Sequence, residues 1–242
     1  MLTVQQIFCR KTFVALSLTV STALAAAANS LEADLAKARN HQDLTMIDAL
    51  IARSKQAAQA DPKSAASQYQ LALAYSYAAE VAMELRDKKK SGTYAQAGVD
   101  PARKAVEISG SNAEYHRLLG EICGQIIPAN PFLGALNYGK CAQDEIDKAI
   151  QLNDKLALAY VSRGVGNYYL PKEMGGGLEL ALQNLDKAIA INPNLTEAYL
   201  WKGIVLRKAN RNSEARQAFE RALQLDPQRL WAKQQLDKTP TQ

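Results

Sequence analysis

The stretch TEAYLWKGIVLRKANRNSEARQAFERALQLDP, residues 196–227, decides the fold of this chain. It ends in Ala-Leu-Gln-Leu-Asp-Pro (222–227), which repeats the Ala-Ile-Ala-Ile-Asn-Pro of residues 188–193 after an interval of 34 residues. The small residues Gly203 and Ala215 stand where two antiparallel helices would cross closely. The final proline would stop the second helix, because proline cannot donate to the helical hydrogen-bond ladder. The pattern therefore predicts helical hairpins that recur with this period.

Small and bulky residues follow one another through this stretch in a definite order: Tyr199, Gly203, Leu206, Ala215, Phe219, Ala222 and Pro227. With the interval of 34 residues, this order resembles the tetratricopeptide repeat (TPR) family. No single hairpin of such an array buries its apolar stripe alone, so hairpins stack on one another. The resemblance implies an all-α chain, folded as a TPR-type right-handed superhelical solenoid of antiparallel helix hairpins with enlarged interhelix loops. The sequence shows no strand pattern, because β-branched residues do not alternate with polar residues over any window. This agrees with an all-α fold.

The same signature recurs towards the amino terminus, with extra residues between the helices of a hairpin. We expect a capping helix and tail over residues 228–242, about four hairpins over 63–227 and an entry helix pair over 29–62. We interpret the Gly-Gly-Gly that ends one enlarged connection as a tight reversal that uses positive φ. The enlarged connections are expected at Lys88–Gly98, Ile126–Tyr138 and Pro171–Gly177.

Four segments of the central region carry a narrower resemblance: Ala113–Gly120, Asp144–Ile150, Gly166–Pro171 and Met174–Gly177. They are similar to a functionally uncharacterised group of exported bacterial TPR proteins with enlarged central hairpins, which implies a fold and not an activity. A looser similarity is to the T component of tripartite substrate-binding transporter systems, whose helical hairpins also carry glycine-rich turns.

The first 28 residues have the order of a secretory signal peptide. Arg10 and Lys11 precede an apolar run, Phe13–Ala28, which contains the Ala23-Leu24-Ala25 pattern of a cleavage site. The run falls short of the roughly 20 residues that a spanning helix needs, so no integral membrane segment is expected after cleavage. Because Cys9 precedes the run, the leader has no lipobox. The leader therefore predicts a periplasmic or secreted protein.

Charge excludes nucleic acid as a partner. Removal of the leader leaves 27 basic and 24 acidic residues, a net charge of +3, whereas binding to a phosphate backbone needs clustered Lys and Arg on one face. The only dense basic run is Arg86–Lys90. We interpret it as a solvated helix end, with its cations at the negative end of the helix dipole.

Catalytic and metal-binding motifs are not found. The chain has two histidines, His41 and His116, and neither H-E-x-x-H nor C-x-x-C spacing. Gly175–Gly177 is followed by Leu-Glu rather than by the Gly-Lys of a phosphate-binding loop. We expect no cofactor, no metal and no enzyme activity, and we interpret His116 as a half-exposed surface histidine. A catalytic alternative would have to combine His116 with Glu114 and Glu121.

Loss of the leader leaves two cysteines, Cys123 and Cys141. They fall on the two helices of one hairpin, and an oxidising compartment would allow a disulfide between them. Two buried free thiols remain the alternative, because sequence does not give the Cα separation that a disulfide requires.

The resemblance to TPR proteins also implies a binding face, the concave surface lined by the first helix of each hairpin. We therefore expect an exported scaffold or adaptor that binds a protein or peptide there, of unknown oligomeric state; the alternative is a T-component-like transporter accessory subunit. Tyr168 and Tyr169 could instead pack under the Pro171–Gly177 connection. Matching the family's positions gives these partner-binding candidates: Tyr69, Tyr77, Arg117, Glu121, Tyr168, Tyr169, Glu197, Leu200, Arg207 and Lys208.

Overall fold

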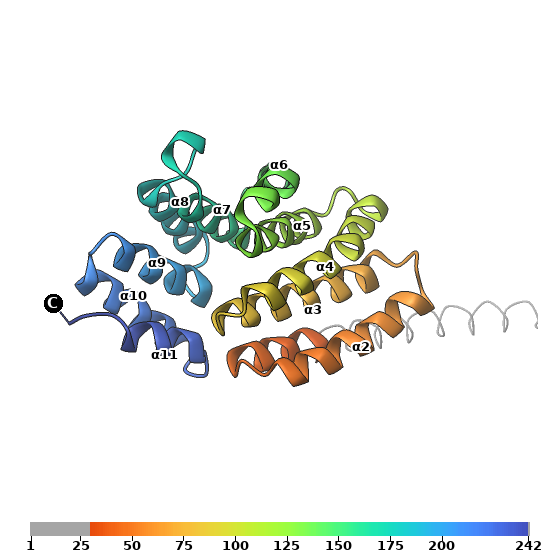
Figure 1. The fold of residues 1–242 in the computed structure, drawn as a ribbon, viewed down its shortest axis with the longest axis horizontal. Coiled ribbons are helices and arrows are strands. Elements are labelled where there is room, and N and C mark those ends of the chain that lie inside the picture. The colour runs from red at the N-terminus through yellow and green to blue at the C-terminus, as the bar shows by residue number, and fades with distance from the viewer. Residues whose placement is uncertain (1–29, 242) are drawn as a thin grey trace, which may run out of the picture.

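The computed structural model describes residues 30–241, and within this range the chain is helical with no strand (Figure 1). The predicted signal peptide and Cys9 lie outside the described residues. A first helix spans residues 30–40. The later elements are α2 (Leu44–Ala60), α3 (Ala65–Glu84), α4 (Lys88–Ile108), α5 (Ala113–Ile126), the 3₁₀ turn η1 (Ile127–Ala129), α6 (Pro131–Leu152), α7 (Ala157–Tyr169), the 3₁₀ turn η2 (Lys172–Met174), α8 (Leu178–Ile191), α9 (Thr196–Lys208), α10 (Asn212–Leu225) and α11 (Leu230–Asp237).

The helices pack as successive hairpins: α3 with α4, α5 with α6, α7 with α8, and α9 with α10. The first helices of neighbouring hairpins also touch, α3 with α5, α5 with α7 and α7 with α9, so they line a common inner face. The second helices lie outside them, and α11 packs on α10 at the carboxyl-terminal end (Figure 1). This is the predicted TPR-type solenoid.

Close helix crossings explain the small residues of the repeat. A Cβ atom on Gly203 would lie 2.5 Å from an atom of the Phe219 ring, and one on Gly164 would lie 3.0 Å from Leu185 Cγ. Gly120 faces Ile146 in the same way, at 2.9 Å. Three hairpins therefore repeat one crossing, in which a glycine of the first helix admits a large apolar side chain of the second.

Two of the three enlarged connections are helical, which differs from the expectation of loops. Residues 88–98 form the first half of α4, where Asp87 caps the helix by accepting a hydrogen bond from the Lys90 amide at 2.9 Å. Residues 131–138 begin α6, where Asn130 caps the helix and Pro131 occupies its first turn. The extra residues lengthen the outer helices because each segment starts with a good amino-terminal cap.

The third enlarged connection is the loop that the glycines predict. After η2 the chain reverses through Gly175, with φ of 79°, and Gly177, with φ of 121°. These left-handed conformations favour glycine, since a side chain there would be strained.

The basic run at residues 86–90 is exposed as expected, but its three lysines do not lie at the end of a helix dipole that favours them. Arg86 occupies the turn after α3 with φ of 66°. Lys88, Lys89 and Lys90 open α4, at the positive end of its dipole. The expectation was wrong for the lysines because the helix starts earlier than the sequence pattern indicated.

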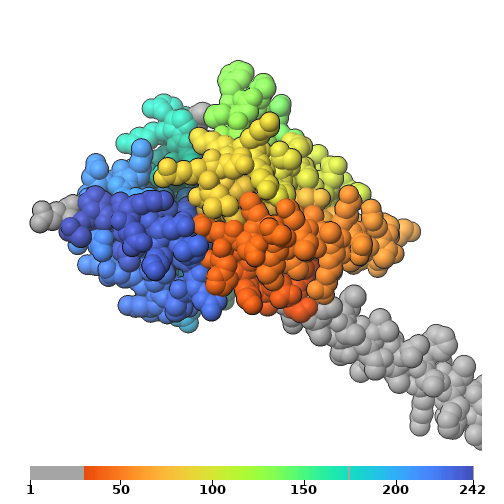
Figure 2. All heavy atoms as spheres, turned by 60° about the horizontal axis from the view of Figure 1, so that its bottom comes forward, coloured from red at the N-terminus to blue at the C-terminus, as the bar shows by residue number. Residues whose placement is uncertain are grey.

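The two ends of the array meet. Asn40 donates a hydrogen bond to Asp226 at 2.6 Å, and the side chains of Gln42 and Gln234 bond to each other at 3.0 and 3.3 Å. Figure 2 shows the red and orange first helices lying against the blue carboxyl-terminal helices. The solenoid therefore closes on itself.

The buried apolar residues form two clusters. One spans Leu31 to Ile126 and fills the entry helix pair, the hairpin of α3 and α4, and α5. The other spans Val161 to Ala232 and fills the last two hairpins. The inner face carries charged, polar and aromatic side chains, and these form the candidate site.

Candidate functional site

The ten partner-binding candidates all lie on helices that line the inner face, α3, α5, α7 and α9. The structure divides this face into two parts with different side-chain chemistry. We call the part on α3 and α5, together with the contacts of Arg229, the closed part, because its polar groups pair with one another. We call the part on α7, α9 and α11 the open part.

Arg117 is the centre of the closed part on α5 and is only 4% exposed. Its guanidinium donates to both carboxylate oxygens of Glu114, at 2.6 and 2.8 Å, and also to Glu121. Glu121 further accepts hydrogen bonds from Ser76 of α3 at 3.0 Å and from Ser162 of α7 at 3.1 Å. The predicted binding groups Arg117 and Glu121 therefore join three neighbouring hairpins.

The tyrosines of α3 belong to the same closed part. Tyr69 donates its hydroxyl hydrogen to Glu114 at 3.1 Å, and burial, followed by the negative charge of Glu114, raises the pKa of Tyr69. The Arg39 guanidinium lies 5.0 Å from the centre of the Tyr77 ring, and burial raises the pKa of that tyrosine too. Both phenols are therefore neutral and engaged by groups of this chain.

Arg229 closes the ring of hairpins. Its side chain is fully buried, and it donates to Glu80 at 2.7 Å, to Glu84, and to Glu197 at 3.0 Å. Glu197 also pairs with Arg39 at 3.1 Å. Two guanidinium groups and three carboxylates thus link the first helix, α3, α9 and the start of α11.

The charges of this network do not balance, and the carboxyl pKa values reflect that. Burial raises the pKa of Glu80 to about 8, although Arg39 and Arg229 act in the opposite direction. Burial also raises the pKa of Glu84. Burial opposes ionisation of Glu197 as well, but Arg229 and Arg39 together lower its pKa. The raised pKa values of Glu80 and Glu84 favour a network that keeps a proton at neutral pH.

The open part is lined by aromatic rings from α7, α9 and α11. Tyr168 and Tyr169 of α7 lie 6.2 and 6.3 Å from Trp201 of α9, measured between ring centroids, and Trp201 lies 5.5 Å from Trp231 of α11. Tyr169 is 55% exposed. We call these four residues the aromatic ladder. The two tyrosines thus contact the next hairpin.

A hollow of about 440 Å³ adjoins the ladder and is lined by Tyr168, Ile204, Arg207, Lys208 and Asn210. Arg207 is held in place, because it donates to the Gln235 carbonyl at 3.0 Å and to the Gln235 side chain at 2.6 Å. Burial lowers the pKa of Arg207. Lys208 is exposed and forms no ion pair with the residues that the structure describes. It is the cation that the open part presents to solvent.

The remaining candidates are buried. Leu200 is fully buried in the apolar cluster of the last two hairpins, and the Glu197 side chain is 12% exposed within the Arg229 network. Sequence matching missed Trp201, Trp231 and Arg229. The first two carried a usable signal, since tryptophans in successive hairpins can meet on one face. Arg229 carried none, because its partners Glu80 and Glu84 are 149 and 145 residues away.

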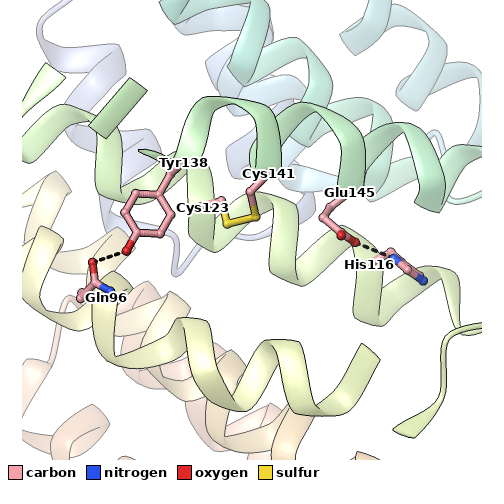
Figure 3. Close-up of a disulfide and its surroundings, with 6 residues drawn as sticks. All are labelled: Gln96, His116, Cys123, Tyr138, Cys141 and Glu145. Carbon is pink, nitrogen blue, oxygen red and sulfur yellow. Dashed lines mark hydrogen bonds and ion pairs between the residues drawn. A yellow bond between two sulfur atoms is a disulfide. The ribbon is translucent and has the colours of Figure 1, made fainter. Parts of the chain in front are cut away.

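The hairpin of α5 and α6 is held by a disulfide and by a buried histidine (Figure 3). Cys123 and Cys141 form a disulfide with a Cα separation of 6.0 Å, which decides between the two alternatives left open by the sequence. His116 is 7% exposed and not half-exposed as expected. Its Nδ1 lies 2.6 Å from Glu145 and its Nε2 lies 2.9 Å from the Gly110 carbonyl oxygen, because the long α6 brings Glu145 opposite it.

The three residues of the catalytic alternative, Glu114, His116 and Glu121, do not come together in the structure. Glu114 and Glu121 pair with Arg117, whereas His116 pairs with Glu145 on the outer helix. Within residues 30–241, no three His, Cys, Asp or Glu side chains gather in a way that could hold a metal ion. No helix in the same range has the length and apolar character needed to cross a membrane.

Comparison with known proteins gives two family matches. A family model described as Regulator of microtubule dynamics protein 1-3 matches residues 24–171, which is more than half of the chain. A model described as Tetratricopeptide repeat matches residues 196–229. The two matches do not overlap.

One curated relative is Regulator of microtubule dynamics protein 3 of Bos taurus, which is 30% identical over 96 residues. The alignment covers 40% of this chain and only 20% of the bovine protein. Among solved structures, a thermophilic TPR protein of Thermus thermophilus has a TM-score of 0.60 at 17% identity, over 80% of this chain and 90% of that one. YrrB, described as a TPR protein with an unusual peptide-binding site, has a TM-score of 0.40 at 17% identity, over 86% and 87% of the two chains. The Thermus structure confirms the TPR-type fold.

Proposed function

This chain belongs to the family described as regulator of microtubule dynamics protein 1-3, and on that premise we propose that it is a scaffold or adaptor that binds an extended peptide segment of a protein partner. The binding surface is the open part of the inner face. The observation that carries the proposal is the aromatic ladder, whose four rings lie on α7, α9 and α11 beside the exposed Lys208.

The ladder suits an extended peptide for three physical reasons. Its rings meet edge to face, and the exposed Tyr169 ring offers apolar area for contact with apolar side chains or proline. Tyrosine and tryptophan lose little rotamer freedom on binding, and each keeps a polar group for hydrogen bonding. A carboxylate of the partner, terminal or side-chain, would pair with Lys208.

The ten candidates take different roles in this proposal. Tyr168, Tyr169 and Lys208 contact the partner, and Arg207 positions the carboxyl-terminal helix beside them through Gln235. The other six hold the array together and reach a partner only if the ring of hairpins opens. They are Tyr69, Tyr77, Arg117, Glu121, Glu197 and Leu200.

We further propose that the protein acts in an oxidising compartment, the periplasm or the exterior of the cell. The signal-peptide pattern of residues 1–28 motivates this. The disulfide between Cys123 and Cys141 is consistent with it, because such bonds persist mainly in oxidising compartments. The intact mass of protein from a periplasmic fraction is expected to correspond to a chain that starts between residues 26 and 30. A full-length chain in the cytoplasm would contradict this proposal.

Two other functions have weaker support. The transporter-accessory alternative depends on the glycine-rich turn alone, and the positive φ of Gly175 and Gly177 accounts for that turn. The bovine relative is named for microtubule dynamics, but the shared segment is about a fifth of its length. The function proposed here is therefore that of the shared helical array.

Site-specific photo-crosslinking tests the binding surface. A photo-reactive phenylalanine analogue at position 169, in mature protein incubated with periplasmic extract, is expected to capture a defined partner. The same analogue at position 180 on the outer helix α8, where Leu180 is 41% exposed, serves as the control. Lys208→Glu is expected to abolish capture at position 169, whereas Lys155→Glu, an exposed change outside the face, is expected to leave it intact. Equal capture at positions 169 and 180 would contradict the proposal.

A further inference from the structure

A second surface lies on the outside of the array, at the start of α6. Phe132 is 79% exposed, Leu133 is 49% exposed and Leu136 is 71% exposed. They occupy the first turns of one helix, so three large apolar side chains share a small area. We call them the α6 ridge. Figure 2 shows this green segment standing out from the molecule beside the yellow start of α4. Clustered exposed apolar side chains of this kind mark interaction sites.

A groove runs alongside the ridge, with a volume of about 800 Å³. Ile126, Leu133 and Tyr138 form apolar walls, and Lys88 and Lys89 form the rim on the α4 side. Its floor is tight, since a Cβ atom on Gly92 would lie 2.5 Å from the Cβ atom of Ala129. The groove is therefore a packed feature of the surface, with an apolar interior and a basic edge.

Three links from α6 fix the walls of this groove (Figure 3). Tyr138 donates its hydroxyl hydrogen to Gln96 of α4 at 2.9 Å, Cys141 is bonded to Cys123 of α5, and Glu145 bonds to His116 of α5. Positions 138, 141 and 145 lie on one face of the helix. A groove held in this way is already formed before a partner arrives, which lowers the entropy cost of binding.

The charge beside the groove indicates the chemistry of its occupant. Lys88 and Lys89 are exposed, and neither forms an ion pair with a carboxylate among residues 30–241. Arg86 and Lys90 are exposed next to them. An occupant that carries carboxylates would therefore find unpaired cations along one edge.

We propose that this groove docks an acidic amphipathic segment of a protein partner. Apolar side chains of the segment enter the groove against Ile126 and Leu133, Phe132 and Leu136 cover its outer side, and its carboxylates pair with Lys88 and Lys89. Helical segments with one apolar face bind grooves in this way. A flat bilayer would contact the α6 ridge but leave the hollow unfilled, so the groove favours a protein segment over a membrane surface.

This site is separate from the aromatic ladder and does not depend on the function proposed for it. The probe is a fluorescein-labelled synthetic helical peptide with leucines on one face and glutamates on the other. Fluorescence anisotropy at low ionic strength is expected to show binding to the disulfide-bonded mature protein. Lys88→Glu/Lys89→Glu and, separately, Phe132→Ser/Leu136→Ser are each expected to weaken binding by about tenfold or more. All four positions are exposed, so circular dichroism is expected to show an unchanged fold.

The controls separate this site from others. Tyr169→Ala/Lys208→Glu is expected to leave the affinity of the peptide unchanged, and a peptide with lysine in place of glutamate is expected not to bind. Equal binding of the acidic and basic peptides would overturn the proposal. Failure of the acidic peptide to bind would also overturn it. In that case, binding to vesicles of anionic phosphatidylglycerol that depends on the same four residues would assign the surface to a membrane, and self-association that depends on them would assign it to a second copy of the chain.

Discussion

The closed and open parts of the inner face are built from equivalent helices of successive hairpins, yet they present opposite chemistry. On α3 and α5 the side chains are charged and paired, with Arg117 held by Glu114 and Glu121. On α7, α9 and α11 the side chains are aromatic, and Tyr169 is 55% exposed. Position in the repeat therefore brings a side chain to the inner face, whereas its pairing with other groups of the chain decides whether it stays accessible to a partner.

Charge explains why the closed part stays closed. The carboxylates of Glu80, Glu84 and Glu197 lie in a buried environment, where an unpaired charge is costly. Arg229 and Arg39 compensate them only when the carboxyl-terminal helices lie against the first helix and α3. Opening the ring would separate these charges from their partners, so the network stabilises the closed arrangement of the hairpins.

The largest effect is expected from removing Arg229. Arg229→Ala leaves three buried carboxyl groups without their shared partner, and it should lower the free energy of unfolding by about 4 kcal/mol. Urea unfolding at neutral pH measures this loss. Arg211→Ala is the matched control, because Arg211 forms an exposed pair with Glu214, and it is expected to change the unfolding midpoint little. Equal effects of the two changes would mean that the ends are not joined by Arg229.

A smaller loss is expected from opening the disulfide. Cys123 and Cys141 are 18 residues apart, and a cross-link over a loop of this size contributes about 3 kcal/mol. The double change Cys123→Ala/Cys141→Ala should lower the unfolding midpoint and make the wild-type response to a thiol reductant disappear. A wild-type midpoint that does not move on reduction would contradict this expectation.

The free energy of unfolding is expected to depend on pH through the buried carboxyl groups of the closed part. The pKa of Glu80 is raised from 4.5 to about 8 by burial, so the folded chain holds a proton that the unfolded chain releases. Its contribution to stability is complete below about pH 4.5, falls as the pH rises to about 8 and is absent above that. Glu84 acts in the same direction, whereas the lowered pKa of Glu197 makes its contribution disappear in acid.

Urea midpoints between about pH 5 and pH 9 check this, because stability should decline across the range. Glu80→Gln, which cannot ionise, should flatten the decline, and Glu179→Gln, an exposed carboxyl on α8, should leave it unchanged. A wild-type decline that persists in full in Glu80→Gln would show that Glu80 is not the group that keeps the proton.

The smallest change in stability is expected in the open part. Tyr169→Ala removes an exposed ring and should cost about 1 kcal/mol or less. Tyr77→Ala removes a tyrosine that packs under Arg39 in the closed part, and it should cost about 3 kcal/mol. Thermal unfolding of the two variants gives the comparison. If Tyr169→Ala were the more costly change, the open part would be a structural element and not a free surface.

Sequence predicts the fold where the reasons are local. Gly203, Ala215 and Phe219 follow the repeat order because one helix crossing needs them, and that crossing is present in the structure. The turn at Gly175 and Gly177 is also a local property, and the structure confirms it. By contrast, the helical form of residues 88–98 depends on the cap at Asp87. The repeat pattern does not include a cap at this position, so it did not predict the helix.

The site was less predictable because its main contacts join distant residues. Alignment with the TPR positions placed Arg117 and Tyr169 on the same face, but the alignment could not show that Arg117 is buried and Tyr169 exposed. Sequence also gave no sign that Arg229 meets Glu84, 145 residues away, in the closed part. His116 was misjudged for a related reason, since Glu145 reaches it only because α6 is long.

The closure of the ring is the central claim, and a cross-link between its two ends tests it most directly. Asn40 and Asp226 are 186 residues apart in sequence, and their side chains are 2.6 Å apart in the structure. With cysteines at both positions and a short bismaleimide reagent, mass spectrometry of the proteolysed protein is expected to show an intramolecular link between residues 40 and 226 in most molecules. The same pair in the Arg229→Ala background should link less. Two singly modified cysteines in the wild-type background, with no link between them, would contradict the closed ring.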